Sequence, residues 1–358
     1  MKRVLDSGKW GKNHCQGFAV DKNRQFVYYS FTTKLIKCDI NGTVVGSVDN
    51  IVGHLGCIDF CDDDGKLYAS LEYKNDAIGR GILNKIGQAD RVIQNGFYIA
   101  VFDVDKIDRI GMDAEESGVM RAVFLKTVTD DFEGFTGENG QIKHVFGCSG
   151  IDGLSIGPDF GAPKCSRNYL CVCYGIYSDP SREDNDYQVI LQYDHEGWWD
   201  SVARPLTQSN MHESGPINPR NKYFLYTGNT TYGVQNLEYD GFTGDWFACV
   251  YNGSKPRFPN YPLFVIDGSK KAEYKPLIGV KPELSGKALS LKNTGLGENG
   301  IFGMDFPLGS TGFYSFGNGQ FYVSEPYSDC GENGARVSAY KLNLGEKWSF
   351  TPITTDEF

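Results

Sequence analysis

One block of residues recurs five times along this chain: a pair of aromatic or branched residues, a polar turn, and a second segment rich in tyrosine. Each copy has the pattern of a β-hairpin, with two short strands joined by a Gly, Asp or Asn turn. The copies span residues 17–31, 57–71, 153–175, 236–253 and 303–326. Because the hairpin returns at intervals of tens of residues, we expect the chain to consist of repeated small sheets.

Further strand-like segments follow each hairpin, so most repeats gain a third and a fourth strand. Four antiparallel strands are the unit of a β-propeller blade. The sequence therefore predicts an all-β fold, a five-bladed β-propeller that forms a single domain over residues 1–358. Residues 194–220 are long enough to contain two more strands and a sixth blade, and a two-layer β-sandwich is the main alternative.

Two details of the propeller are predicted from the same pattern. The outer strand of the fourth blade is expected near residues 274–279. Residues 1–7 are expected to pair with the last blade, which would remove the open edge of the ring.

Charge and composition exclude several function classes. The formal net charge is −10, whereas nucleic acids and anionic membranes attract basic surfaces, so we expect neither as a partner. No apolar run approaches the roughly 18 residues of a membrane span, and residues 1–13 do not resemble a signal peptide. These features predict a cytoplasmic protein, or a secreted one if a leader has been removed. Five cysteines lie inside predicted strands, where we expect buried, reduced thiols: Cys57, Cys61, Cys171, Cys173 and Cys249.

Some blade segments resemble known propeller families. The hairpin GKLYASLEY at 65–73, followed by FDVDKI at 102–107, resembles blades of the NHL and SMP-30/gluconolactonase-like propellers. Five blades with carboxylates along the channel, together with His212-Glu213-Ser214, are similar to the calcium-dependent apyrases. These resemblances cover scattered blade segments and include no complete family motif. They imply the fold and assign no catalytic residue.

Propeller geometry indicates where a functional site would lie. The connections between second and third strands, and those from an outer strand to the next inner strand, open on one face of the ring. Several of these connections are long, at 74–96, 176–187, 253–261 and 327–335. Long loops on a rigid scaffold commonly carry binding residues, so we expect the site at the channel mouth on this face.

Four residues at the mouth are candidates for catalysis. His14 and His54 occupy equivalent positions where the first two inner strands begin, and Glu72 and Glu325 follow second strands. His14, His54 and Glu72 together would suit a divalent transition metal with an open coordination position. Acid–base use of the imidazoles without a metal is an alternative. In a further alternative, each imidazole has only a structural role and fixes its own turn by hydrogen bonding.

Polar and aromatic residues around the same mouth are candidates for substrate binding. Tyrosine faces can stack on sugar rings, while carboxylate, imidazole and amide groups can bind hydroxyls. The candidates are Tyr73, Tyr174, Tyr177, Asp179, His212, Gln235, Tyr251 and Tyr327.

A second metal hypothesis concerns the inner strands. Asp59, Glu238 and Asp305 align at one inner-strand position, so their carboxylates are expected to converge on the channel. Converging carboxylates repel unless a cation, a proton or backbone N–H groups compensate them, and calcium takes several oxygen ligands. In the alternative reading, each carboxylate binds backbone of the neighbouring blade and stays solvated.

The predicted function is a small-molecule-binding propeller, expected to be a hydrolase or lyase acting on a carbohydrate or another polyhydroxylated metabolite. A non-catalytic propeller that binds a ligand or a protein on the same face is the alternative. A calcium-dependent phosphohydrolase is a third hypothesis, motivated by the carboxylate ring. The expected partner is a small molecule such as a sugar, and the sequence predicts no oligomeric state.

Overall fold

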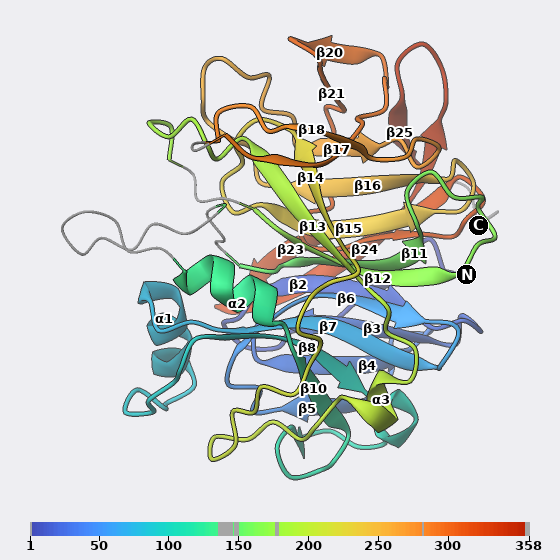
Figure 1. The fold of residues 1–358 in the computed structure, drawn as a ribbon. Coiled ribbons are helices and arrows are strands. Elements are labelled where there is room, and N and C mark those ends of the chain that lie inside the picture. Colours follow the sequence, from blue (N-terminus) through green and yellow to red (C-terminus); the bar gives the residue numbers. More distant parts are fainter. Residues whose placement is uncertain (1, 135–145, 147–149, 176–178, 281–282, 355–358) are drawn as a thin grey trace.

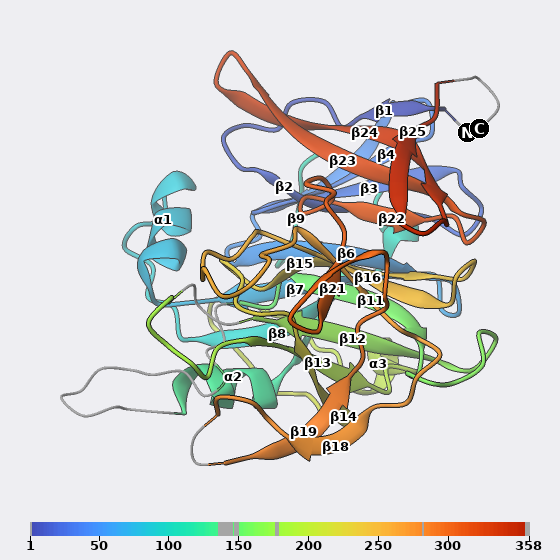
Figure 2. The same ribbon diagram turned by 90° about the horizontal axis from the view of Figure 1, so that it is seen from above.

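The computed structural model describes residues 2–134, 146, 150–175, 179–280 and 283–354. Its strands form five small sheets arranged as a ring (Figures 1 and 2), which confirms the five-bladed β-propeller. Within each blade the neighbouring strands run antiparallel. Among the described residues, no helix is both long enough and apolar enough to cross a membrane.

The first three blades each have four antiparallel strands. The first contains β2 (Cys15–Val20), β3 (Phe26–Phe31), β4 (Lys34–Asp39) and β5 (Val44–Asp49). The second contains β6 (His54–Cys61), β7 (Lys66–Tyr73), β8 (Gly96–Phe102) and β10 (Met120–Phe124). The third contains β11 (Gly153–Pro158), β12 (Asn168–Tyr174), β13 (Tyr187–Tyr193) and β14 (Asn221–Tyr226).

The last two blades are less regular. The fourth contains β15 (Val234–Asp240), β16 (Asp245–Val250) and β17 (Leu263–Ile266). The fifth contains β22 (Phe313–Ser315), β23 (Gln320–Asp329), β24 (Glu332–Asn343), β25 (Ser349–Pro352) and β1 (Val4–Asp6).

Short elements decorate the ring. The α-helices are α1 (Ala77–Lys85), α2 (Lys126–Glu133) and α3 (Trp198–Ser201), and a 3-10 turn spans Val104–Lys106. The remaining short strands are β9 (Met112–Asp113), β18 (Glu273–Pro276), β19 (Ser285–Leu289), β20 (Leu296–Glu298) and β21 (Ile301–Gly303).

The hydrophobic core is divided among the contacts between neighbouring blades. The buried apolar residues form five clusters, and each cluster joins two adjacent blades around the ring. Cys171 and Cys173 are fully buried in the cluster between the third and fourth blades, as alternation along one strand predicts. Cys57, Cys61 and Cys249 are also buried as free thiols. The blades are therefore held to one another mainly by apolar packing.

The ring closes between its first and last segments. β1 pairs antiparallel with β24, and the partners run from Val4 with Ser338 to Asp6 with Arg336. The backbone N–H of Ser7 also donates to the carbonyl of Ala335 at 3.0 Å. This confirms the predicted pairing of residues 1–7 with the last blade, which shields one edge of that blade.

Two sequence-based assignments were wrong, at 274–279 and in the fifth blade, and the six-blade alternative is excluded. The segment near 274–279 forms β18, which pairs with β19, and β19 adds in parallel to β14 of the third blade. Residues 194–220 contain α3 and no strand. The inner strand of the fifth blade is β22, because β21 turns back to pair with β20 before the chain reaches the ring. Pro307 follows, and proline cannot donate to a strand ladder.

Candidate functional site

A polar cluster lies where the second and third blades meet at the channel mouth. His54 is the first residue of β6, and its register partner on β7 is Glu72. Asp152 comes just before β11, the inner strand of the next blade. Because both inner strands enter the ring from the same face, these three side chains converge. Within the described residues they are the one group whose three potential metal-ligand atoms lie within 4.8 Å of one another.

Glu72 is the centre of the cluster. Its side chain is 2% exposed, and its Oε1 lies 2.6 Å from the Lys74 ammonium and 3.2 Å from His54 Nδ1. Its Oε2 accepts a hydrogen bond from the backbone N–H of Ile151 at 3.0 Å. Both carboxylate oxygens are therefore engaged, and the Lys74 side chain, which is 4% exposed, compensates the buried charge.

Asp152 has a free bonding position. Its Oδ2 accepts a hydrogen bond from the amide of Gln235 at 3.2 Å. Its Oδ1 lies 3.5 Å from His54 Nδ1 and has no hydrogen-bond partner among the described residues, although the atom is buried. A buried carboxylate oxygen without a donor is costly, so a ligand hydroxyl or a water molecule would bind well there.

The electrostatics favour charged forms of Glu72, Lys74 and His54. Burial alone would raise the pKa of Glu72, but the charge of Lys74 and the hydrogen bond with His54 lower it to about 2. Burial opposes a charged Lys74, but the adjacent Glu72 raises its pKa. Burial also opposes a charged His54, yet the hydrogen bond with Glu72 and the charge of Asp152 raise the pKa of His54. Asp152 responds differently, because burial raises its pKa and Glu72 adds to the rise.

Two glycines make room for the carboxylates. Gly150 has a φ of +155°, and a Cβ at this position would lie 2.5 Å from Glu72 Oε2. A Cβ at Gly56 would lie 2.4 Å from Ser70 Oγ and 3.1 Å from Asp152 Oδ1. Any larger residue at either position would displace the acidic side chains.

Exposed aromatic rings lie near the cluster. Tyr251, directly after β16, is 39% exposed and packs edge-on against Tyr232, which is 46% exposed. Burial of the hydroxyl raises the pKa of Tyr251, and the charge of Asp152 contributes, which places the phenol within electrostatic reach of the cluster. Accessible aromatic rings of this kind are suitable for stacking against a polar ligand.

The structure brings together four of the residues that the sequence singled out: His54, Glu72, Gln235 and Tyr251. Two charged members of the cluster, Lys74 and Asp152, were not among the site residues predicted from the sequence. A usable signal existed for each of them. Lys74 follows Glu72 by two residues, and Asp152 stands two residues after Gly150, the third-blade equivalent of His54.

Several predicted residues lie elsewhere. His14 is exposed on the first blade and is not part of the three-residue group. Tyr73 is buried against Tyr98, since it points to the opposite side of β7 from Glu72. Tyr174 is fully buried and donates to Asp131.

The remaining predicted contacts also have other roles. His212 packs against Tyr98 and bonds the carbonyl of Arg204, in a segment that runs along the outer strand of the second blade. Glu325 and Tyr327 lie within β23, which continues to Asp329, so neither stands in a loop. The Tyr327 hydroxyl donates to Asp6 at 2.7 Å, next to the ring closure. Tyr177 lies outside the described residues.

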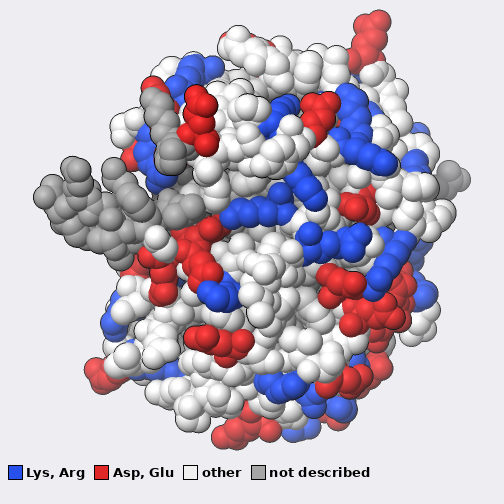
Figure 3. Space-filling model, in the orientation of Figure 1, with Lys and Arg blue, Asp and Glu red and all other residues white. Residues whose placement is uncertain are grey.

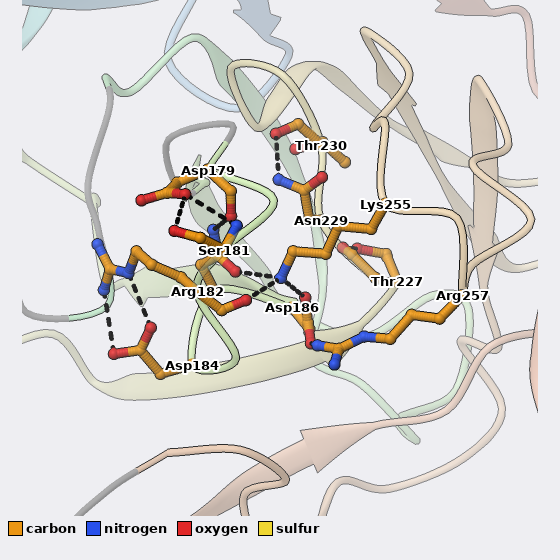
Figure 4. Close-up of polar contacts among 12 residues, drawn as sticks. Asp179, Ser181, Arg182, Asp184, Asp186, Thr227, Asn229, Thr230, Lys255 and Arg257 are labelled. Carbon is orange, nitrogen blue, oxygen red and sulfur yellow. Dashed lines mark hydrogen bonds and ion pairs between the residues drawn. The ribbon is translucent and has the colours of Figure 1, made fainter.

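A buried lysine joins the loops on this face between the third and fourth blades. The Lys255 ammonium contacts the carbonyl of Arg182 at 2.6 Å and the Asp186 carboxylate at 2.5 Å (Figure 4). It also donates to Asn185. Lys255 and Asp186 side chains are each 2% exposed. Arg257 binds the other oxygen of Asp186 from the surface (Figure 4). Lys255 follows Tyr251 in the same loop, so this network fixes the loop that carries the exposed ring.

Asp179 belongs to this loop network and not to the Glu72 cluster. Its Oδ1 accepts from the backbone N–H and the hydroxyl of Ser181 (Figure 4). Its carbonyl accepts from the side-chain amide of Asn185. These bonds shape the loop between β12 and β13. Asp179 therefore has a local structural role in the described contacts.

The channel carboxylates do not form the predicted ring of three. Asp59 Oδ2 accepts from Ser155 Oγ at 3.1 Å and from the N–H of Ile156 at 2.7 Å, both in the next blade. Glu238 Oε1 accepts from the N–H of Ser315 at 2.7 Å, also in the next blade. Asp305 is exposed and lies outside any strand, because β22 is the inner strand. The contacts match the alternative in which carboxylates bind neighbouring-blade backbone.

The raised pKa of Asp59 should make the folded protein less stable as the pH rises. Burial raises its pKa from 3.8 to about 7, despite the hydrogen bonds from Ile156 and Ser155. The folded state therefore binds this proton more tightly than the unfolded state, and the associated stability is lost as pH rises from about 4 to about 7. Asp59→Asn should be on the order of 4 kcal/mol more stable than wild type at pH 8 and nearly equal at pH 4.

Urea unfolding at both pH values measures this effect, and Asp63→Asn in the exposed turn is the matched control. An Asp59→Asn protein that gains no stability at pH 8 would contradict the proposed burial of charge.

Comparisons with known proteins identify no family. No protein-family model matches the chain, and no curated protein matches it. Among solved structures, the holo PQQ domain of pyranose dehydrogenase from Coprinopsis cinerea aligns with a TM-score of 0.35 and 13% identity, over 90% of this chain and 81% of that chain. The β-propeller domain of Cps50 (Swd1) from Myceliophteria thermophila aligns with a TM-score of 0.34 and 8% identity, over 92% of this chain and 84% of that chain. Such similarities carry no information about function.

Proposed function

We propose that the protein binds a polyhydroxylated small molecule, such as a sugar or a sugar acid, at the channel mouth and transfers a proton to or from it. The observation that carries the proposal is the pair of His54 and Glu72 beside Asp152 Oδ1, a buried oxygen that accepts no hydrogen bond from the described residues and lies 3.5 Å from His54 Nδ1. Ligand hydroxyls would donate to this oxygen. The half-exposed ring of Tyr251, which packs edge-on against Tyr232, would be available for stacking.

The arrangement supports acid–base chemistry at His54. Glu72 binds Nδ1 of the imidazole at 3.2 Å, so the carboxylate fixes the ring and leaves Nε2 to exchange protons with a ligand. A protonated imidazole oriented by a carboxylate can give its Nε2 proton to a leaving oxygen and then take one back from water or from a ligand. Hydrolysis and elimination both need such a group. We therefore favour a hydrolase or lyase over a non-catalytic scaffold.

The test begins with calorimetric titration of the purified protein with monosaccharides, sugar acids, linear polyols and short oligosaccharides. One of these classes of compound should bind to the wild-type protein. The substitution Asp152→Asn should weaken the affinity of the protein for that class about tenfold or more, because a hydrogen bond to a charged group contributes about 1.5–3 kcal/mol. Asp63→Asn is the matched control outside the mouth. Equal affinity in the Asp152→Asn and Asp63→Asn proteins would contradict this site.

Turnover separates an enzyme from a scaffold. His54→Gln should retain ligand affinity within a few-fold and lose product formation, which chromatography of the reaction mixture measures. If the wild-type protein binds every member of the class but converts none of them to product, the non-catalytic alternative is correct.

A metal-assisted version rests on one specific observation, the convergence of ligand atoms from His54, Glu72 and Asp152. Lys74 Nζ lies 2.6 Å from Glu72 and would compete with a cation for that oxygen. Elemental analysis of the purified protein tests this version. A stoichiometric metal that is lost in the Asp152→Asn protein would support it, whereas ligand binding that survives chelation would contradict it.

A further inference from the structure

A cavity lies between the first and second blades, on the face of the ring opposite to the channel mouth. Its lining comes from the turn between β2 and β3, from the end of β6 with the turn that follows, and from the 3-10 turn after β8. His54 and Glu72 stand at the other ends of β6 and β7, so the two sites are separate. The cavity has a volume of about 260 Å³. Sites for drug-sized ligands commonly have about 300–1,000 Å³, so this cavity would hold a smaller molecule.

Three aromatic side chains form one wall of the cavity: Phe26, Tyr28 and Phe60. Phe26 and Tyr28 are two residues apart on β3, so both point toward the second blade, where they join one apolar cluster with Phe60. The rings of Tyr28 and Phe60 are parallel to within 6°, with centroids 6.1 Å apart. Phe26 and Phe60 are only partly buried, so ring surface is available to a ligand.

The hydroxyl of Tyr28 is a polar group at this wall without a partner. Tyr28 is 1% exposed and lines the cavity, yet its hydroxyl forms no hydrogen bond with the described residues. Burial raises the pKa of Tyr28, and the charges of Asp21 and Asp105 add to the rise, so the hydroxyl faces the two lining carboxylates. An unpaired hydroxyl in a buried position is costly, and a ligand N–H group would bind well there.

Carboxylates outnumber cations around the cavity. Asp21, Asp62 and Asp105 line it, and Lys22 is the one cation among the described lining residues. Asp21 accepts backbone N–H groups of its own turn, including that of Gln25 at 2.7 Å. The carboxylates of Asp62 and Asp105 have no hydrogen-bond or ion-pair partner in the described part of the chain, since Lys22 donates to the backbone carbonyl of Asp62 at 3.1 Å. This lining differs from the face drawn in Figure 3, where Lys and Arg side chains lie among Asp and Glu side chains.

A buried lysine next to the aromatic wall shows that these carboxylates favour a cation. Lys37 is 6% exposed, and its ammonium donates to the carbonyl of Val104 at 2.8 Å and lies 4.5 Å from the centre of the Phe26 ring. Burial lowers the pKa of Lys37, and the charges of Asp105 and Asp21 oppose the fall. The same charges would stabilise a ligand cation in the cavity, where carboxylates still outnumber ammonium groups when Lys37 is included.

We propose that this cavity binds a small organic amine, a molecule with one protonated amino group on an aromatic or alkyl body. The ammonium would donate to the Tyr28 hydroxyl and face Asp62 and Asp105, and the body would lie against the ring of Phe60. A metal ion fits less well, because these carboxylates are not gathered within 4.8 Å of one another as the group at the channel mouth is. The proposal does not depend on the function proposed for the channel mouth.

The test is calorimetric titration of the intact protein with 2-phenylethylamine and with butylamine. We expect saturable binding of at least one amine at one site per chain, weakened by salt because the carboxylates are exposed. Tyr28→Phe removes only the hydroxyl and should lower the affinity about tenfold or more, since hydrogen bonds with a charged group are among the stronger ones. The double substitution Asp62→Asn, Asp105→Asn should also lower it about tenfold or more. Asp90→Asn and Asp200→Asn together make the same charge change outside the lining and should leave the affinity within about twofold of wild type.

A neutral analogue separates specific binding from general attraction of cations to an acidic protein. 2-Phenylethanol has the same ring and no charge, and it should bind at least about tenfold more weakly than 2-phenylethylamine. Absence of saturable binding for both amines would overturn the proposal. Equal affinity for the neutral analogue, or equal affinity of the Asp62/Asp105 variant and the control variant, would also overturn it. Circular dichroism of each variant verifies that the fold is retained.

Discussion

Replacing Lys255 by alanine should lower the free energy of unfolding by about 3–5 kcal/mol. The ammonium lies 2.5 Å from the Asp186 carboxylate, both side chains are 2% exposed, and the carbonyl of Arg182 is a further partner. Removal of one partner leaves the other charge in a site with little water, and this is the main cost. Equilibrium unfolding in guanidinium chloride measures the loss.

Two comparisons test whether burial of charge is the cause. Arg257→Ala removes the other cation on Asp186, but its side chain is 49% exposed, so we expect a loss of no more than about 1 kcal/mol. The double variant Lys255→Met, Asp186→Leu replaces both buried charges and should recover part of the loss. A Lys255→Ala protein that loses less than the Arg257→Ala protein would contradict this account of the loop network.

Glu72→Gln should be the most damaging single substitution at the channel mouth, with a loss of about 3–5 kcal/mol in the free energy of unfolding at neutral pH. The substitution removes the charge that compensates Lys74 at 2.6 Å in a buried site. It also removes the carboxylate that raises the pKa of His54, so that pKa should fall. Chemical denaturation and an NMR titration of the His54 ring measure the two effects.

The stability difference between Glu72→Gln and the wild type should shrink in acid. The pKa of Glu72 is lowered to about 2 in the folded state, so its stabilising effect is present above its ordinary value and is lost as pH falls from about 4.5 toward 2. The two proteins should therefore converge in stability over that range. Glu325→Gln makes the same change in β23, outside the cluster, and should have little effect on the His54 titration. An unchanged His54 pKa in Glu72→Gln would be evidence against the pair.

The blades could be predicted from the sequence because a hairpin is a local structure. Its turn residues and its alternating apolar positions lie within about 15 residues of one another, so one chain shows the complete pattern. The closing strand was also predictable, because an open blade edge needs a partner. The inner strand of the fifth blade could not be predicted, because the aromatic segment around Phe306 resembles a strand as much as Phe313–Ser315 does. Only packing against the neighbouring blades distinguishes them.

The candidate site was predicted in part for a related reason. His54 and Glu72 stand at the ends of recognisable paired strands, so their proximity followed from the hairpin. Asp152 reaches the cluster from the next blade, and its position depends on the stagger between two sheets. Tyr73 illustrates the opposite error, because a shift of one residue along β7 moves a side chain from the mouth into the core.

The pairing of β1 with β24 bears on how the chain folds. Residues 4–6 are synthesised more than 300 residues before their partners at 336–338. The first blade can form soon after its own synthesis, whereas the fifth blade cannot be completed until residues 336–338 are present. Contacts between such distant segments carry a high entropic cost and form slowly. We therefore expect ring closure to be a late folding step, preceded by an open chain of blades whose unpaired edges are available to chaperones and to other copies of the chain.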